Sequence, residues 1–140
     1  MERRLDELTR TEAIRLLTTA SVGRLGITMD ALPAILPVNY AVVDDAIVFR
    51  SSPGAKVSAA VQGAVVAFEA DESDVRSSTG WSVLVVGRAR EITDRARLEQ
   101  VRSLGLRSWV PGARDRFVEI PLDIVTGRRI TAPVGDLHHD

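Results

Sequence analysis

The chain has 140 residues, a net charge of -1 at pH 7 and no cysteine. This length is enough for one domain with a hydrophobic core, and the near-neutral charge gives no general attraction to nucleic acid or anionic membranes. The absence of cysteine excludes disulfides, thiolate catalysis and cysteine-ligated metal sites. Because the sequence also lacks a long apolar run and a signal-like segment, we expect a cytoplasmic protein with no membrane partner.

The first third of the chain predicts one helix and three strands. Residues 2–20 carry apolar side chains near helical spacing, and Thr9 and Glu12 stand in the S/T-x-x-E relation of a capping box. A helix is therefore expected over this range, with its main part beginning at Arg10. Strands are expected at residues 21–29, 32–43 and 46–50.

The remainder of the chain predicts two more helices and four strands. The helices are expected at residues 54–62 and at about 94–106, the second of them opened by Thr93-Asp94. Residues 71–79 are polar and predict a loop, and residues 132–140 predict a flexible tail. The strands are expected at residues 64–70, 80–92, 114–124 and 126–131.

The expected strands are joined mainly by short connections, which favours antiparallel pairing. Six or seven strands, with two glycines in the strand at residues 21–29 that allow a bend, favour a closed or partly closed barrel over a flat sheet. No internal repeat or linker divides the sequence. We therefore expect a single, mainly β domain over residues 1–140, with an N-terminal helix within residues 1–20.

One stretch of the sequence combines groups that bind anions. Arg50, Ser51 and Ser52 end an apolar run, and Lys56 follows a Pro-Gly turn. A guanidinium, an ammonium and two hydroxyls are donors suited to a phosphate, although a solvated turn explains the same residues. The spacing of a nucleotide-triphosphate P-loop is absent, so we do not expect a nucleotide triphosphatase.

Other catalytic constellations find little support in the sequence. The only histidines are His138 and His139, in the expected tail, so neither a metal site nor a Ser-His-Asp site is predicted. Trp81 begins a strand and could stack on a flat ligand, and Asn39 and Tyr40 place polar groups beside an apolar face. Tyr40 is the nearest candidate proton donor. This inventory favours a borrowed cofactor that carries the chemistry itself.

Six short motifs stand in a distinctive order along the chain. They are G-R-L-G from Gly23, L-P-V-N-Y from Leu36, I-V-F-R-S from Ile47 with a lysine at position 56, F-E-A-D from Phe68, G-W-S-V from Gly80 and T-G-R-R-I from Thr126. Together they resemble the pyridoxamine 5'-phosphate oxidase-like split-barrel flavoproteins over roughly residues 5–131. The small actinobacterial type, related to nitroimidazole-resistance proteins, is the most similar.

This resemblance implies a six-stranded antiparallel split β-barrel with flanking helices. It also implies a homodimer that binds two FMN cofactors at its interface, with no nucleic-acid partner. The FMN phosphate would be held by Arg50, Ser51, Ser52 and Lys56. The flavin ring and ribityl chain would be approached by Val38, Asn39, Tyr40, Trp81, Ser82 and Val83.

We therefore expect an FMN-binding oxidoreductase that transfers hydride or electrons through flavin N5 to or from an unidentified small molecule. One alternative is a reductase of the same fold that uses the deazaflavin F420, and another is a non-catalytic flavin-binding or interaction module. A basic groove for F420 would draw on Arg24, Arg88, Arg90 and Arg128. The chain lacks the body histidine of nitroimidazole-resistance relatives and the greater length of the vitamin-producing oxidases, so neither specific chemistry is expected here.

Overall fold

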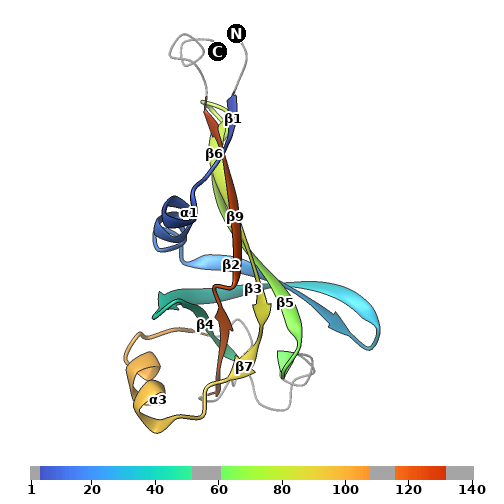
Figure 1. Cartoon of the computed structure of the whole chain (residues 1–140), viewed down its shortest axis with the longest axis vertical. Coiled ribbons are helices and arrows are strands. Elements are labelled where there is room, and N and C mark those ends of the chain that lie inside the picture. The colour runs from blue at the N-terminus through green and yellow to red at the C-terminus, as the bar shows by residue number, and fades with distance from the viewer. Residues whose placement is uncertain (1–3, 52–60, 108–115, 132–140) are drawn as a thin grey trace.

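The computed structural model describes residues 4–51, 61–107 and 116–131. In these residues nine strands form one sheet in the order β1-β9-β6-β5-β2-β3-β4-β8-β7, with every pairing antiparallel (Figure 1). The strands are β1 (Arg4–Glu7), β2 (Val22–Met29), β3 (Leu32–Val43), β4 (Ala46–Ser51), β5 (Val65–Asp74), β6 (Thr79–Arg88), β7 (Arg90–Glu91), β8 (Arg116–Pro121) and β9 (Ile124–Thr131). The helices are α1 (Arg10–Leu17) and α3 (Arg95–Arg102).

The local signals near the N-terminus gave accurate boundaries. The predicted strand 32–43 is found as β3, and α1 begins at Arg10. The capping box forms as expected, because the Thr9 hydroxyl accepts from the Glu12 amide at 3.2 Å and the Glu12 carboxylate accepts from the Thr9 amide at 3.3 Å. The mainly β, antiparallel fold with flanking helices is confirmed.

The prediction of one helix over residues 2–20 is wrong at both ends. Residues Arg4–Glu7 form β1, which pairs with the end of β9 from Arg4↔Thr131 to Glu7↔Arg128. The edge of β9 offers unpaired backbone groups, and pairing with it overrides a weak local helical preference. Helix α1 then ends at Leu17, with Thr18 as its C-cap.

The predicted loop at residues 71–79 is instead the tip of a long hairpin. Strand β5 runs to Asp74 and β6 begins at Thr79, with the two in register as far as Asp74↔Thr79. Together with β1 and the end of β9, this hairpin forms an arm that projects from the rest of the molecule (Figure 1). Residues 71–79 at the tip are mostly polar and exposed, which hides these strand ends from a hydrophobic pattern.

The long strand predicted at residues 80–92 is broken after Arg88. A Cβ atom on Gly87 would lie 2.5 Å from the carbonyl oxygen of Pro121, so only glycine fits where β6 passes the end of β8. Ala89 still exchanges backbone hydrogen bonds with Gly63 and Ala64, and β7 then pairs with β8 instead of with β5 and β9, the two neighbours of β6. The predicted helix 54–62 lies mostly, and the tail 132–140 wholly, outside the described residues.

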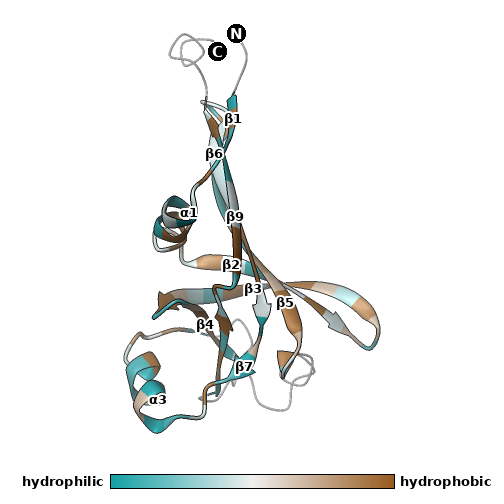
Figure 2. Cartoon of the chain, in the orientation of Figure 1, coloured by the Kyte–Doolittle hydropathy of each residue, from teal (hydrophilic) through white to brown (hydrophobic). Residues whose placement is uncertain are grey.

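Two hydrophobic clusters lie on opposite faces of β4. Ile47 and Phe49 point into the main core, and Val48 points into a smaller cluster beneath α3. This double burial explains why β4 is apolar at successive positions, and Figure 2 shows it in brown beside the mostly teal α3. In the described part of the chain, no helix is long and apolar enough to cross a membrane.

Candidate functional site

The fold brings Asn39 and Arg50 together on the face of the sheet that α3 covers. Strands β3 and β4 pair from Val43↔Ala46 to Tyr40↔Phe49, and Asn39 and Arg50 are the next residues beyond this last pair. Side chains alternate along a strand, and Arg50 therefore shares the face of Val48, which packs beneath α3. Two of the predicted cofactor residues thus meet at the margin of the smaller cluster.

The chain that follows α3 lies against both side chains. The Asn39 side-chain amide donates to the carbonyl oxygen of Arg107 at 3.1 Å, and Arg50 Nη1 donates to the carbonyl oxygen of Leu106 at 3.4 Å. These contacts span more than fifty residues of sequence, and no sequence pattern pointed to them. Residues 106–107 form one wall of this candidate site.

Val38, Tyr40 and Ser51 point to the opposite face, toward the main core. The Tyr40 ring is 3% exposed and meets Phe68 edge-on at 4.7 Å, and its hydroxyl donates to the Leu17 carbonyl at 2.6 Å. Burial raises the pKa of the Tyr40 hydroxyl above its usual range. The Tyr40 side chain therefore has a structural role in the core, where its hydroxyl proton is bonded to the Leu17 carbonyl.

Of the residues that the sequence assigns to the phosphate, the structure describes Arg50 and Ser51, and Asn39, which the resemblance assigns to the flavin ring, lies on the same face as Arg50. Ser52 and Lys56, which the sequence also assigns to the phosphate, lie outside the described residues. A half-buried guanidinium beside a side-chain amide suits a phosphate oxygen, because charge-assisted donors are the strongest partners for that group. The chemistry of the described donors fits the predicted ligand.

Trp81, Ser82 and Val83 form a second group, on the arm. Trp81 and Ser82 line a cavity of about 620 Å³, and Val83 lines a neighbouring cavity of about 420 Å³. Neither cavity includes Asn39 or Arg50 in its lining. Among the described residues, Asn39 with Arg50 forms one group and Trp81 with Ser82 and Val83 forms another.

A charged cluster that the sequence interpretation missed lies beside the arm cavities. Arg24 Nη1 is 3.1 Å from Glu69 Oε1 and 2.8 Å from Asp71 Oδ2, and Glu69 lines both cavities. Burial, first, and then a hydrogen bond with Asp71 and the negative charge of Asp71 together raise the pKa of Glu69 to about 7, against the opposing effect of Arg24. The F-E-A-D motif could have predicted this cluster, because Glu69 and Asp71 are two positions apart and alternate residues of a strand lie on the same face.

Three of the four arginines considered for a deazaflavin groove are engaged by protein groups. Arg24 pairs with the cluster just described, Arg88 donates to the Gly63 carbonyl at 2.5 Å, and Arg90 lies 3.6 Å from Glu119. Arg128 is exposed and lines both arm cavities. These partners leave less cationic surface for a polyanionic cofactor than the sequence suggested.

Comparisons with known proteins identify relatives along nearly the whole chain. An uncharacterized protein of Mycobacterium tuberculosis, Rv0080, is 47% identical over 135 residues, which cover 93% of this chain and 88% of that protein. A solved structure described as the FAD binding protein from Mycobacterium smegmatis is 34% identical with a TM-score of 0.76, covering 88% of this chain and 96% of that one. A putative pyridoxamine 5'-phosphate oxidase from Corynebacterium glutamicum is 31% identical with a TM-score of 0.79, covering 92% of this chain and 100% of that one.

The family model agrees with the structural relatives. The model described as pyridoxamine 5'-phosphate oxidase matches residues 9–129, which include both groups of candidate site residues. The resemblance inferred from the six sequence motifs is thereby confirmed. The chain belongs to the pyridoxamine 5'-phosphate oxidase family.

Proposed function

We propose that this protein binds a flavin and acts as a flavin-dependent oxidoreductase. The observation that carries the proposal is that Arg50 and Asn39 bond to two successive carbonyls on one face of β3 and β4, where a phosphate would find a cation and an amide. A relative of known structure, 34% identical, is described as an FAD binding protein. Family membership and local chemistry thus favour the same ligand class.

The residues of the chain would bind and orient the flavin, while the bound flavin would supply hydride or electron transfer. Arg50, with Lys56 from the neighbouring segment, would bind the phosphate end, and Asn39 would add a neutral donor. Ser82 and Trp81 would serve the ring end. FMN is our proposed form of the cofactor, and FAD is the alternative that the relative's description favours.

We propose further that each site is shared between two copies of the chain. Trp81, Ser82 and Val83 line the two arm cavities, whereas Asn39 and Arg50 line neither of them. This separation supports a site to which different copies contribute. The outer face of the sheet also exposes large apolar side chains that a partner would cover. These include Ile35 at 75%, Val65 at 59% and Ile124 at 58% exposure.

The direct test is to identify the cofactor that the purified protein releases on denaturation, by absorbance and mass spectrometry. We expect a yellow protein that releases a flavin. The apoprotein should then be titrated with FMN, FAD, riboflavin and F420. A colourless protein that binds F420 but no flavin would contradict the proposal, and a bound flavin that no reductant or acceptor turns over would favour the non-catalytic alternative.

Replacing both cations of the phosphate end, Arg50→Ala with Lys56→Ala, should abolish FMN retention. Each charge-assisted contact contributes about 1.5–3 kcal/mol, so the pair should weaken binding by at least two orders of magnitude. Arg15→Ala, which removes an exposed arginine from α1, is the matched control. Unchanged FMN affinity in the double variant would remove the phosphate assignment.

A further inference from the structure

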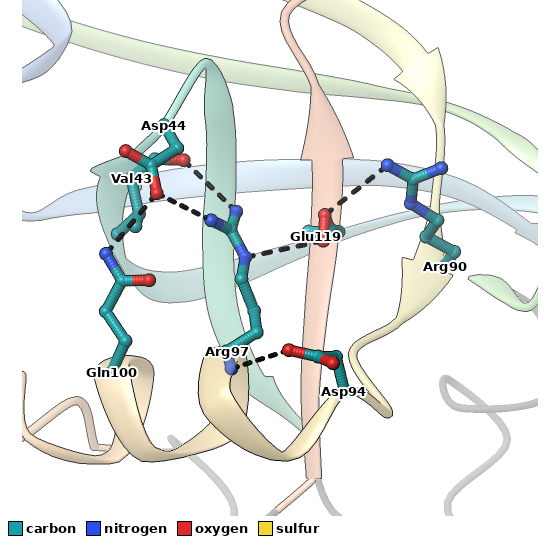
Figure 3. A network of polar contacts seen from close by, with 7 residues as sticks. All are labelled: Val43, Asp44, Arg90, Asp94, Arg97, Gln100 and Glu119. Atoms are coloured by element: carbon teal, nitrogen blue, oxygen red, sulfur yellow. Dashed lines mark hydrogen bonds and ion pairs between the residues drawn. The ribbon is translucent and has the colours of Figure 1, made fainter.

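Arg97 attaches helix α3 to the sheet through three groups (Figure 3). Its Nη1 atom lies 2.9 Å from Asp44 Oδ2, its Nη2 atom donates to the Val43 carbonyl at 3.3 Å, and its Nε atom lies 3.7 Å from Glu119 Oε1. The Arg97 side chain is only 18% exposed. A single guanidinium therefore bridges the end of β3, the turn after it and the middle of β8, a geometry that lysine does not reproduce.

The carboxylate of Glu119 makes this attachment specific. Its side chain is 12% exposed, and a carboxylate so far from water requires cationic partners. Arg97 is the better buried of its two arginines, since the Arg90 side chain is 66% exposed and lies 3.6 Å away. Asp94 also caps α3 by accepting from the Arg97 amide at 3.0 Å, so the first turn of the helix is fixed in position.

The far end of α3 leads directly to the candidate site. After the C-cap at Ser103, Gly105 adopts a φ of 68°, the left-handed conformation that ends helices and reverses the chain. Leu106 then packs against the smaller hydrophobic cluster. As a result, the carbonyls of residues 106 and 107 face the side chains of Arg50 and Asn39.

We propose that Arg97 is a positioning residue of the cofactor site. By fixing α3, it fixes the carbonyls of Leu106 and Arg107, and these orient Arg50 and Asn39 before the ligand arrives. A long arginine side chain loses much rotational freedom on binding, and prior orientation reduces that cost. This inference rests on the proposed function, because it requires Arg50 to bind the flavin phosphate.

The distinguishing measurement compares FMN with riboflavin, which differ only by the phosphate. The ratio of their dissociation constants reports the phosphate contact, whereas a general loosening of the fold weakens both ligands alike. We expect Arg97→Ala to reduce this preference for FMN about fivefold. Arg50→Ala should reduce it tenfold or more, and a tenfold change corresponds to about 1.4 kcal/mol of binding free energy. In the double variant, the loss of Arg97 should change the ratio much less than it does in the wild-type background, because Arg50 is the charged group through which Arg97 acts and Asn39 adds only a neutral donor.

Matched variants separate positioning from folding. Arg95→Ala removes an exposed arginine from the same helix and should leave the ratio unchanged. If Arg97→Ala fails to fold, Asp44→Asn is the substitute, because it weakens the ion pair between Arg97 and Asp44. The Asp44 side chain is 70% exposed, and asparagine tolerates the positive φ of 44° at this position. Arg97→Lys should restore only part of the preference.

The outcomes are distinguishable from those of the proposed function. A wild-type protein that binds no flavin, or a ratio that Arg50→Ala does not change, overturns the phosphate assignment and this inference with it. The inference alone is overturned by a different result. In that case Arg50→Ala lowers the preference for FMN over riboflavin, but Arg97→Ala and Asp44→Asn both keep the same preference as the control Arg95→Ala. A selective fall in Arg97→Ala that becomes much smaller in the Arg50→Ala background supports the inference, and a fall of the same size in both backgrounds overturns it.

Discussion

The hydroxyl of Tyr40 donates a hydrogen bond of 2.6 Å to the carbonyl oxygen of Leu17, the last residue of α1. This bond joins β3 to the end of the N-terminal helix inside the main core. It satisfies a helix carbonyl that has no partner within the helix, and it holds the Tyr40 ring edge-on to Phe68. The contact therefore stabilises the packing of α1 on the sheet.

Replacing Tyr40 with phenylalanine should lower the free energy of unfolding by about 1–3 kcal/mol, because it leaves a buried carbonyl without a donor. Urea denaturation followed by tryptophan fluorescence would measure the loss, with an unchanged m-value. Flavin affinity and reduction rate should stay near wild type. A stable variant with a slow reduction step would instead restore Tyr40 as a proton donor.

Two glycines of β2 should differ sharply in their tolerance of alanine. A Cβ atom on Gly23 would collide with the Phe68 ring and lie 2.9 Å from the Glu69 carbonyl, whereas one on Gly26 would lie 3.6 Å from the Ala67 Cβ. We expect Gly23→Ala to cost about 1–3 kcal/mol through overpacking, and Gly26→Ala to be neutral or slightly stabilising. Thermal unfolding of the pair would show the contrast, and equal melting temperatures would contradict the packing.

Glu69 should make folding stability depend on pH. Its pKa is about 7 in the folded protein against an ordinary value of 4.5, so the folded state holds an extra proton between these values. Its contribution is therefore fully present below about pH 4.5, declines as pH rises through 7, and is constant above that.

Glu69→Gln should flatten this part of the stability profile, because glutamine stays neutral and still bonds to Arg24 and Asp71. Melting temperatures measured from pH 5 to pH 8 would test this, with Glu72→Gln as an exposed control on the same strand. An unaltered slope in Glu69→Gln would show that the carboxylate does not take up a proton in this range.

The shared site predicts complementation between two defective chains. Arg50→Ala removes the phosphate end of one copy, and Trp81→Ala removes the ring end of the other. If each site takes one group from each copy, a mixed dimer retains one intact site, and random mixing should restore about a quarter of the flavin sites. Co-refolding the two variants and measuring bound flavin would test this, and no recovery would place both groups in one chain.

Local sequence patterns predicted the features that depend on neighbouring residues, namely the start of a helix and the ends of a strand. The capping box at Thr9 placed the start of α1, and turn residues bounded β3. The pairing of β1 with β9 joins positions more than a hundred residues apart, and the contacts of residues 106–107 with Asn39 and Arg50 are equally non-local. Such contacts depend on the strand order and on the position of α3 against the sheet, and no local sequence pattern determines these.

One site detail follows from alternation along a strand. The sequence prediction ended its strand at residue 50, which left Ser51 free to join Arg50 at a phosphate. Strand β4 includes Ser51, whose side chain is 4% exposed on the core side, opposite to Arg50. The two side chains therefore serve different faces.

The strand order also affects the behaviour of the protein in concentrated solution. The two outermost strands, β1 and β7, have four and two residues, the fewest of the nine described. The edge strands of a sheet have backbone groups with which a strand of another chain can pair. Short edge strands have few such groups, so they limit this edge-to-edge association. The longer and more apolar strands β3 to β6 are all interior, so the sequences most prone to fibril formation are protected by their place in the sheet.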